Sequence, residues 1–405
     1  MTATAIEWGT RTLGSLGKWL SGGTPSRSNP EYWGGDIPWI SAKSLTSFRV
    51  SESDRYVTEA GLHNGTRSVP PGTLLFLVRG MSLKSEFRMG ITTARVAFNQ
   101  DVKAIVPNPD VDARFLAYAL QAATPRVLAM VGSAAHGTGR LPTDLMRDLE
   151  IAVPRKDIQE AVAAILSAYD DLIENNNRRM ELLEEAVRLL YREWFVHLRF
   201  PGHERVEVVD GVPEGWRRGV ASELVEVLSG GTPRTSVEHY WNGPIPFFTP
   251  KDAPAGVFVW ETEKSLTEEG VANCSSREFP KGTIFITARG TVGKLAVAQR
   301  PMAVNQSCYA LAPRPPFGIP FAFAAMAHMV SYLQQAATGG VFDTIIKKTF
   351  DRTPVLLPAE NLVASFSDVA RPMLRQVETL STMNRKLRKA RDLLLPRLMD
   401  GRIPV

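Results

Sequence analysis

An internal repeat constrains the fold of this chain more than any other feature. The segment SGGTPSRSNPEYWGGDIPWISAKSL, which begins at Ser21, returns from Ser229 as SGGTPRTSVEHYWNGPIPFFTPKDA. An ungapped alignment pairs the two Ser-Gly-Gly-Thr-Pro starts, Tyr32-Trp33 with Tyr240-Trp241, Ile37-Pro38 with Ile245-Pro246, and Lys43 with Lys251. Identity this dense between distant segments predicts one structural unit that is used twice.

Further matches extend the repeat along the chain. Each copy has a Pro-Gly turn followed by an apolar run that ends in Arg-Gly, at Arg79-Gly80 and at Arg289-Gly290. Such a run, bounded by turn residues, is typical of a buried strand. The remaining matches are Asn99-Gln100 with Asn305-Gln306 and Val153-Pro154 with Leu357-Pro358. The chain therefore divides into two copies, roughly 1–199 and 200–405.

Each copy ends in a helical pattern. Apolar residues recur every three or four positions from Ile158 to Trp194 and from Leu362 to Leu394, which predicts two long amphipathic helices. Asp157 is the expected N-cap of the first helix, and a polar Asn176 in its seam is of the kind that fixes register. In the second helix, Pro372 should kink or split the start and Pro396 should end it.

Two such helices can bury their apolar seams on each other, antiparallel if a pseudo-twofold relates the copies. The alternative is that each is a core helix of a separate domain. We expect the first arrangement, an α+β fold in which two long helices pack as an antiparallel coiled coil and join two pseudo-symmetric globular domains. The expected divisions are globular domains at 1–155 and 200–357, and helices at 156–199 and 358–405.

Composition limits the class of protein. Lys plus Arg number 47 against 42 for Asp plus Glu, a net charge of +5 that permits a polyanionic partner. Two cysteines without zinc-type spacing favour a reducing compartment. We expect a cytoplasmic protein, since no signal-peptide pattern and no apolar run of about 18 residues is present.

The tetrad Asn29-Pro30-Glu31-Tyr32 is close to the motif that amino-methyltransferases place against a flipped base. The second copy, Val237–Tyr240, keeps only the tyrosine. The sequence also has no Gly-rich cofactor loop in the right context. Gly293-Lys294 does not form a phosphate loop, because it is followed by Leu295 and lacks the earlier glycine of that motif. We therefore expect no cofactor, and packing roles for the repeated Tyr and Trp. A stand-alone adenine-N6 DNA methyltransferase and a non-DNA scaffold protein remain as alternatives.

These motifs resemble the specificity (S) subunit of type I restriction–modification enzymes over essentially the whole chain. The resemblance is carried by the paired SGGTP…YW…IP and Pro-Gly-Thr…Arg-Gly segments, by LIENNNRRMELLEEAVRLLYREWFVHLRFPG and by LRKARDLLLPRLMDGRI. It implies two target-recognition domains, each reading one half of a split site in double-stranded DNA. The helices would set the spacing and dock two methyltransferase (M) subunits.

The resemblance also implies a division of labour. M subunits would carry the S-adenosylmethionine site and methylate adenine, and restriction (R) subunits would add translocation and cleavage. This chain would be a non-catalytic DNA-recognition subunit with no membrane association. Because the two copies differ outside their shared motifs, we expect an asymmetric bipartite site. The modest net charge predicts weak DNA binding by the chain alone.

Candidate DNA contacts lie in the repeated loops. Glycine turns let backbone N–H groups approach phosphates, Arg reads guanine edges, Lys contacts phosphates, and Asn or Gln reads adenine. Surface charge, turn geometry or strand capping are the alternatives. A third region is 132–140, which includes His136, with its counterpart 338–348. The candidates are Gly22, Gly23, Thr24, Lys43, Arg79, Lys84, Asn99, Gln100 and Arg140 in the first copy, and Gly230, Gly231, Thr232, Lys251, Arg289, Lys294, Asn305, Gln306, Lys347 and Lys348 in the second.

Candidate partner contacts lie on the helices. The aromatic residues Tyr191, Trp194 and Phe195 could form a docking surface, since aromatics dominate interfaces, or could pack on the second globular domain. Near the C-terminus, a basic cluster that includes Arg388 and Arg391 should pair with the acidic residues of the first helix and dock a partner. The acidic residues expected in this pairing are Glu181, Glu184 and Glu185. A contact of the basic cluster with the DNA backbone is the alternative.

Overall fold

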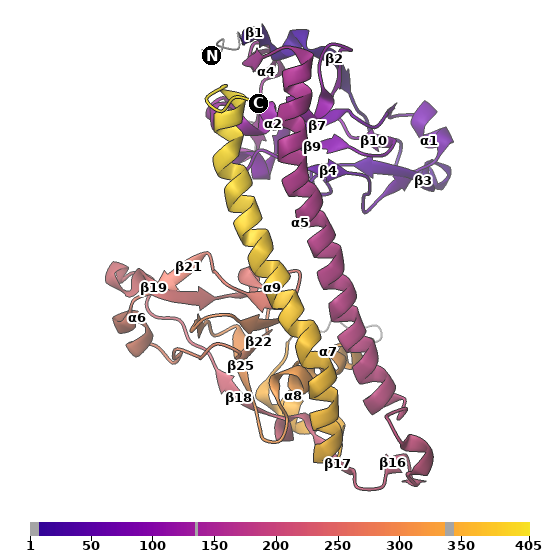
Figure 1. The fold of residues 1–405 in the computed structure, drawn as a ribbon, viewed down its shortest axis with the longest axis vertical. Helices are drawn as coiled ribbons and strands as arrows, with labels where there is room; N and C mark the ends of the chain where they lie inside the picture. Colours follow the sequence, from indigo (N-terminus) through magenta and orange to yellow (C-terminus); the bar gives the residue numbers. More distant parts are fainter. Residues whose placement is uncertain (1–7, 134–136, 337–343) are drawn as a thin grey trace. The chain divides into compact units, whose positions relative to one another are not determined.

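The computed structural model describes residues 8–133, 137–336 and 344–405. The chain folds into two compact units. Unit 1 holds the described residues up to Ile173 together with Lys386–Val405, and unit 2 holds Glu174–Arg385. Each unit contains one globular copy of the repeat and a stretch of both long helices (Figure 1).

A five-stranded sheet forms the centre of unit 1. Its order is β2-β11-β7-β9-β4, and neighbours run antiparallel except β9 and β4, which are parallel. The strands are β2 (Gly17–Ser21), β11 (Val102–Pro107), β7 (Leu74–Leu77), β9 (Met89–Thr92) and β4 (Arg49–Val50). All four residues of β7, Leu-Leu-Phe-Leu, are buried, which confirms the buried strand predicted after the Pro-Gly turn.

Smaller sheets and short helices surround this centre. The sheets have the orders β5-β3-β10-β6, β12-β13-β8 and β1-β14. Their strands are β5 (Tyr56–Val57), β3 (Trp33–Ile40), β10 (Val96–Phe98), β6 (Ser68–Val69), β12 (Gly132–Ser133), β13 (Gly139–Arg140), β8 (Arg79–Gly80), β1 (Gly9–Thr12) and β14 (Glu150–Val153). The helices are α1 (Glu59–His63), α2 (Ala113–Ala122), α3 (Thr124–Ala129) and α4 (Thr143–Arg147).

Unit 2 repeats this plan. Its central sheet has the order β18-β25-β22-β23-β20, again with one parallel pair at the β20 edge. The order β21-β19-β24 and the pair β17-β26 match β5-β3-β10 and β1-β14 of unit 1, and the hairpin β15-β16 is an addition. The matching central sheets and flanking strands confirm that the sequence repeat is a structural repeat, although no sheet in the described part of unit 2 corresponds to β12-β13-β8.

The elements of unit 2 have the following bounds. The strands are β15 (Val208–Val209), β16 (Val212–Pro213), β17 (Arg217–Val220), β18 (Val225–Ser229), β19 (Trp241–Phe248), β20 (Phe258–Val259), β21 (Lys264–Leu266), β22 (Ile284–Thr287), β23 (Leu295–Ala298), β24 (Ala303–Val304), β25 (Cys308–Pro313) and β26 (Pro354–Leu357). The helices are α6 (Glu268–Ala272), α7 (Ile319–Ala336) and α8 (Lys347–Arg352).

Two long helices, α5 (Lys156–Tyr191) and α9 (Glu360–Met399), pass through both units. In unit 1 the first turns of α5 share a core with the last turns of α9, where Val162 and Leu398 are both buried. In unit 2 the end of α5 meets the start of α9, and the rings of Tyr191 and Phe366 lie 6.0 Å apart. Within each unit the two helices therefore run antiparallel, as predicted.

Asn176, the polar residue predicted in the helix seam, lies in unit 2. Asn176 Nδ2 donates a hydrogen bond to Asn384 Oδ1 at 2.9 Å, and both side chains are 1% exposed. Asn384 Nδ2 in turn donates to Asn177 Oδ1 at 2.8 Å. A buried amide pair of this kind favours one register of two helices over the others.

The predictions that Pro372 would split the second helix and that Pro396 would end it are wrong. Pro372 and Pro396 both lie inside α9, which is one unbroken helix (Figure 1). A proline inside a helix costs about 3 kcal/mol. Burial of Leu374 next to Pro372 and of Leu395 and Leu398 around Pro396 offsets that cost. Sequence periodicity alone did not reveal this packing.

The predicted start of the first helix is also displaced. α5 begins at Lys156, so Asp157 lies in its first turn rather than at the N-cap. A carboxylate in the first turn still favours the helix, because it faces the positive end of the helix dipole. No helix in the described part of the chain has the length and apolar character needed to cross a membrane.

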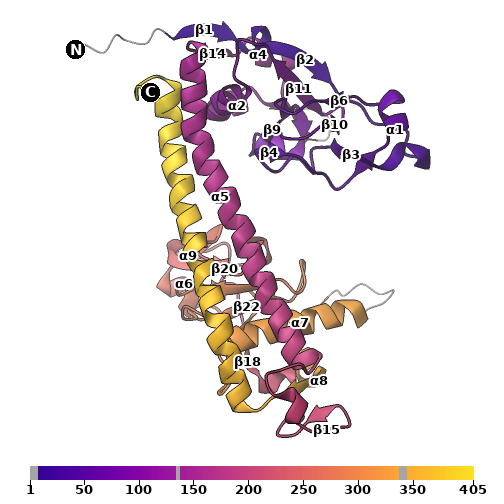
Figure 2. The same cartoon turned by 45° about the vertical axis from the view of Figure 1, so that its right-hand side comes forward.

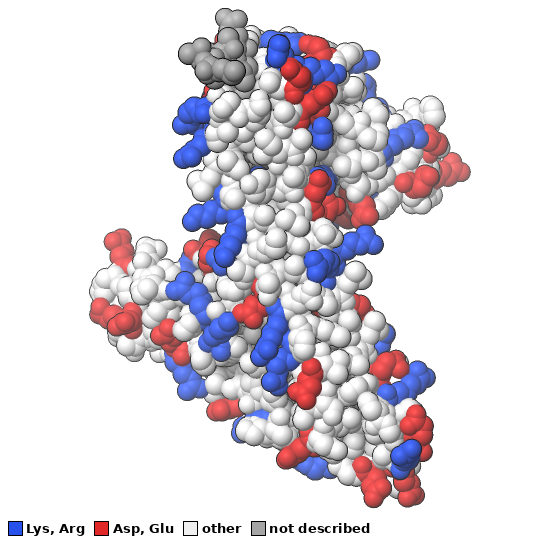
Figure 3. All heavy atoms as spheres, in the orientation of Figure 1, with Lys and Arg blue, Asp and Glu red and all other residues white. Residues whose placement is uncertain are grey.

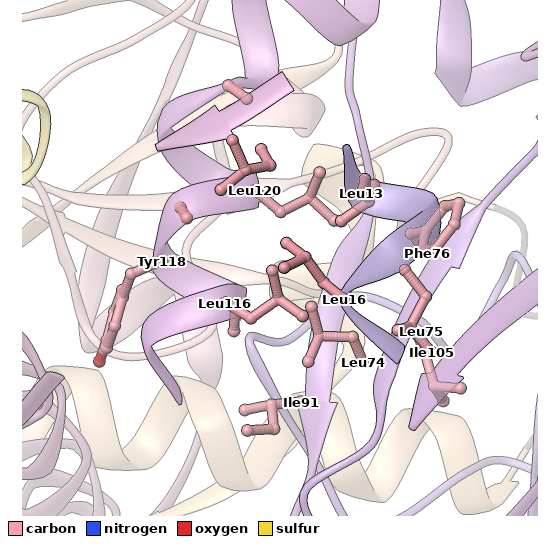
Figure 4. Close-up of a cluster of buried hydrophobic side chains, with 14 of the residues drawn as sticks. Leu13, Leu16, Leu74, Leu75, Phe76, Ile91, Ile105, Leu116, Tyr118 and Leu120 are labelled. Atoms are coloured by element: carbon pink, nitrogen blue, oxygen red, sulfur yellow. The ribbon is translucent and has the colours of Figure 1, made fainter. Parts of the chain in front are cut away.

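The core of unit 1 lies between the central sheet and α2. Figure 4 shows its side chains converging from β7, from α2 and from the segment that contains Leu13 and Leu16, and every side chain it labels is at most 7% exposed. Tyr118 of α2 lies at the margin of this cluster and donates from its hydroxyl to Asp170 Oδ2 of α5 at 2.5 Å. Figures 1 and 2 both show α2 beside α5.

Candidate nucleic-acid interface

In unit 1 the structure brings the predicted DNA-contacting loops together at one end of the central sheet. Gly23 N donates to Phe98 O at 3.0 Å, which joins the Gly-Gly-Thr turn to the segment before Asn99. Val78 N donates to Asp101 O at 2.8 Å, and Leu141 N donates to Val78 O at 2.9 Å. These bonds connect the Asn-Gln turn, the Arg-Gly turn and the third candidate region in a row.

Unit 2 repeats these connections. Gly231 N donates to Val304 O at 3.0 Å, Ala288 N donates to Ser307 O at 2.7 Å, and Ile345 N donates to Ala288 O at 3.0 Å. The same backbone bonds therefore hold the same four loops in both units. Loops that differ in sequence are therefore held at the same place in each unit by a shared scaffold, and loops placed in this way by a rigid scaffold commonly carry binding residues.

The glycines of the Gly-Gly-Thr turn have a packing reason. A Cβ on Gly22 would lie 2.1 Å from Phe98 O, and a Cβ on Gly230 would lie 2.2 Å from Asn305 O. The N–H groups of Gly23 and Gly231 already donate to backbone carbonyls. Close packing therefore accounts for these glycines in itself, and a phosphate contact at this turn stays a prediction.

In each Asn-Gln turn the two side-chain amides have different roles. Asn99 Oδ1 accepts from Asp101 N at 3.1 Å, and Asn305 Oδ1 accepts from Ser307 N at 3.0 Å, so both asparagines stabilise their own turns. This is the capping role that the sequence left open. Gln100 Oε1 accepts from Thr24 at 2.7 Å, and Gln306 pairs with Thr232 in the same way.

The glutamine nitrogens of these turns are better placed than the asparagines to meet DNA. Within the described residues, Nε2 of Gln100 and Nε2 of Gln306 have no hydrogen-bond acceptor, and both side chains are exposed or partly exposed. Each amide nitrogen can therefore donate to a ligand while its oxygen is held by threonine. A donor fixed in this way is suited to reading an acceptor on a base edge.

Unit 1 gathers three exposed cations that the sequence placed in two separate regions. β8 and β13 pair antiparallel with Arg79 directly opposite Arg140. A Cβ on Gly137 would lie 3.5 Å from Lys84 Nζ, so Lys84 reaches over the same region. We call Arg79, Lys84 and Arg140 the unit-1 basic cluster. None of its members forms an ion pair in the part of the chain that the structure describes.

The placement of Arg79 beside Arg140 has an electrostatic consequence. Like charges directly opposite each other destabilise an antiparallel pair. A carboxylate nearby would relieve this repulsion, but no Asp or Glu among the described residues forms an ion pair with either arginine. Two exposed arginines at directly opposite positions of a strand pair are suited to binding an anion, because Arg can bond phosphate or a guanine edge in two places.

Unit 2 has an equivalent group, Arg289, Lys294, Lys347 and Lys348, which we call the unit-2 basic cluster. All four side chains are exposed, and within the described ranges none forms an ion pair. Ile345, which bonds to Ala288, holds the two lysines of α8 near the Arg289 turn. His136 and residues 338–343 of the third region lie outside the described residues.

The repeated lysines, Lys43 and Lys251, differ in their ion pairing. Lys43 Nζ pairs with Asp54 Oδ2 at 2.8 Å, and this bond lowers the pKa of Asp54 below its usual value. The Lys43 side chain is nevertheless 84% exposed. Lys251 is exposed and has no ion pair within the described ranges. Both lysines lie next to the candidate loops, because Asn99 N donates to Ile40 O and Asn305 N to Phe248 O.

The methyltransferase-like tetrad is part of a structural turn. Asn29 Oδ1 accepts from Glu31 N at 3.0 Å and caps a short helical turn. Trp33 packs edge-on against Trp39 at 5.2 Å, as Trp241 packs against Phe247 at 5.6 Å in unit 2. The repeated tryptophans therefore have the packing role that the sequence predicted.

The aromatic residues at the last position of α5 and in the helical turn that follows it, Arg192–Val196, pack in the core of unit 2. Tyr191 is 7% exposed and Phe195 is 5% exposed, and Phe195 packs against Phe321 and Phe366 at 5.0 and 5.3 Å. Trp194 is partly buried against Phe366. Packing on the second globular domain, the alternative left open above, accounts for these residues, and a docking role for them stays a prediction.

The basic cluster of α9 pairs differently from the sequence prediction. Arg391 forms an ion pair with Asp170, and Arg385 pairs with Glu261. Glu185 pairs with Arg188, while Glu184 Oε1 accepts from Val257 N at 3.3 Å. Sequence reasoning assigned the wrong partners because it had the antiparallel direction but not the register of the helices.

Arg388 remains exposed on α9. On the face drawn in Figure 3, Lys and Arg side chains gather along the course of this helix. The exposed basic residues of α9 are Arg371, Arg375, Arg385, Lys386, Arg388, Lys389 and Arg397. Partner docking through Arg388 stays a prediction. Among the described residues, no group of three His, Cys, Asp or Glu side chains is arranged to hold a metal ion.

Comparison with known proteins identifies the family. The sequence model described as "Type I restriction modification DNA specificity domain" matches residues 5–185 and again 213–362. The MjaIX type I restriction enzyme specificity subunit of Methanocaldococcus jannaschii is 24% identical over 98% of this chain and 94% of its own. The EcoR124I/EcoR124II specificity subunit of Escherichia coli is 30% identical over 47% of this chain and 46% of its own.

The fold is also found in a solved structure. The type I restriction–modification S subunit from M. genitalium aligns with a TM-score of 0.57 at 16% identity, over 98% of each chain. At this identity the likeness concerns the fold alone. It supports the arrangement of two globular domains and two long helices described above.

Proposed function

We propose, from the premise that this chain belongs to the type I restriction–modification DNA specificity family, that it is the DNA-recognition subunit of such a complex. It carries the family's specificity domain twice and is non-catalytic. Unit 1 reads one half of a bipartite site in double-stranded DNA, and unit 2 reads the other half. The two long helices connect the readers and set the spacing between the half-sites.

One observation carries this proposal. Each unit holds a basic cluster that forms no ion pair with a carboxylate among the described residues, at a place fixed by the same backbone hydrogen bonds. DNA offers phosphates to the lysines and guanine edges to the arginines. The clusters differ in residue type and number, so the half-sites should differ in sequence.

The partners follow from the family. We propose that M and R subunits complete the complex, with two M subunits per chain because the repeated units offer two similar surfaces. A cytoplasmic location is proposed as well, since a DNA-reading subunit has to reach the cell's DNA. The net charge of +5 is small for a protein that binds a long duplex alone, so we expect tight binding only within the complex.

A methylation map tests the function. N6-methyladenine is located across the genome of the source strain, with and without the gene for this chain. We expect one split motif to lose methylation on deletion and to regain it on complementation. Unchanged methylation, in a strain whose M subunits are expressed, would contradict the proposal. Methyl transfer to DNA by the purified chain alone would favour the methyltransferase alternative instead.

A further inference from the structure

Met81 is an exposed apolar side chain within the unit-1 basic cluster. It begins a short 3₁₀ helix, η3 (Met81–Lys84), which directly follows Arg79-Gly80. Its side chain is 64% exposed, whereas Leu83, two residues later, is fully buried. Leu83 therefore anchors the turn to the core and leaves Met81 on the outside.

The geometry of η3 places Met81 beside a cation. Side chains at positions i and i+3 of a 3₁₀ helix eclipse each other, so Met81 lies on the same side of the turn as Lys84. Lys84 reaches toward Gly137, and Arg79 lies opposite Arg140. Met81 thus shares its face with the basic cluster.

Exposure alone would not mark Met81 as functional, because single apolar residues are common on protein surfaces. The cations around Met81 indicate a binding role. Met81 places a flexible, polarizable thioether among three cations that form no ion pair with any described residue. It presents apolar contact area next to side chains of the kind that bind phosphate and guanine. In the major groove of DNA, the feature that such an apolar group can recognise is the 5-methyl group of thymine.

We propose that Met81 contacts the 5-methyl group of a thymine in the half-site that unit 1 reads. This inference rests on the proposed function and names a specificity determinant within it. Lys84 and the arginines fix the loop on phosphates and guanine edges, and Met81 distinguishes thymine from bases without the methyl group. Sequence reasoning missed this residue, since a lone methionine between Arg79 and Lys84 forms no pattern.

The contact should belong to one half-site. In unit 2 the equivalent sequence is Arg289-Gly290-Thr291, so a shorter and more polar side chain stands in the place of Met81. Gly290 and Gly293 have φ values of 79° and 85°, and this turn has a different backbone from η3. Unit 2 therefore lacks an equivalent apolar reader at this position.

Deoxyuridine substitution tests the contact, because it removes only the 5-methyl group. The chain is purified with its M subunits, and binding is measured to a duplex that carries the methylated motif. Each thymine of the unit-1 half-site is replaced in turn by deoxyuridine. We expect one replacement to weaken binding by about fourfold, the value of one buried methyl group. In Met81→Ala the same replacement should have no effect, since the contact is already lost.

Thr291→Ala is the matched control at the equivalent position of unit 2, and it should leave the deoxyuridine effect in the unit-1 half-site unchanged. The inference is overturned if no deoxyuridine weakens binding, if the half-site contains no thymine, or if Met81→Ala shows the same deoxyuridine effect as the natural protein. Each of these results leaves the proposed function standing, provided that the complex binds the motif. A complex that fails to bind the motif contradicts the proposed function and the inference together.

Discussion

Asp170 of α5 and Arg391 of α9 form an ion pair inside unit 1, and the equivalent pair in unit 2 is apolar. Their side chains are only 11% and 16% exposed, and Tyr118 also donates to Asp170. Counted from the starts of α5 and α9, Leu374 stands where Asp170 does and Val187 where Arg391 does. Both residues are buried in the core of unit 2. The helix positions that hold an ion pair in unit 1 are therefore filled by buried hydrocarbon side chains in unit 2.

This asymmetry predicts the behaviour of single and combined substitutions. Arg391→Val alone leaves Asp170 buried without its cation and should lower the free energy of unfolding of unit 1 by about 3–5 kcal/mol. Arg391→Val combined with Asp170→Leu and Tyr118→Phe copies the apolar solution of unit 2 and should recover most of that loss. Denaturant unfolding followed by fluorescence measures both, and a combined variant as unstable as the single one would refute the equivalence.

The Asn176–Asn384 hydrogen bond in the helix seam should contribute measurably to the free energy of unfolding of unit 2. Asn176→Leu removes the donor to Asn384 Oδ1, and losing a hydrogen bond in a buried site costs about 1–3 kcal/mol. Asn175→Leu at the adjacent exposed position is the control and should change stability by less than about 0.5 kcal/mol. Equal effects of the two substitutions in denaturant unfolding would mean that the buried pair contributes nothing.

The arginines of the unit-1 basic cluster should lower the stability of unit 1 while they strengthen DNA binding. Arg140→Ala relieves the repulsion with Arg79, so we expect unit 1 to become more stable by a few tenths of a kcal/mol. The same change should weaken binding of the complex to its motif. If Arg140 contacts phosphate, the slope of log K against log salt should fall by about 1. Arg155→Ala, an exposed arginine paired with Asp157, is the control for both measurements.

Glu184 should make unit 2 sensitive to pH. Burial raises the pKa of this carboxyl above its usual value, against the weaker effect of the hydrogen bond from Val257 N. A raised pKa in the folded state favours the protonated form, so this group contributes stability at low pH that is lost as pH rises through the raised pKa. Glu184→Gln keeps an oxygen acceptor for Val257 and removes the charge.

The Gln variant should therefore be more stable than the natural chain at pH 7. The difference should shrink as the pH falls through the raised pKa and vanish below about 4, where the carboxyl is protonated in both folded and unfolded chains. Thermal unfolding across pH 4–8 measures this, with Glu185→Gln at the neighbouring exposed position as control. A stability difference that does not depend on pH would show that the Glu184 charge is not the cause.

Sequence reasoning recovered what is local or repeated. The buried strand before Arg79-Gly80 follows from a Pro-Gly turn and an apolar run, and its return before Arg289-Gly290 predicted a second unit with the same plan. The apolar seams of α5 and α9 predicted that these helices pack on each other, and the repeat predicted that they run antiparallel. These features depend on residues close together in the chain or on the comparison of two copies.

Sequence reasoning failed where distant residues decide the outcome. Pro372 does not break α9, because burial of residues around it outweighs the lost hydrogen bond. Arg391 pairs with Asp170 rather than with Glu184, which only the register of the helices determines. Arg79 and Arg140 belong to separate predicted loops, and only the β8–β13 pairing places them side by side.

The most direct test of the central claim changes one basic cluster at a time and maps the methylated motif. Strains carry Arg79→Ala with Arg140→Ala, or Arg289→Ala with Lys347→Ala, in place of the natural chain. If each unit reads one half-site, the first pair should relax or lose one half of the motif and leave the other half intact, and the second pair should do the reverse. Changes spread over both halves by either pair, or an unchanged motif with both, would contradict the account.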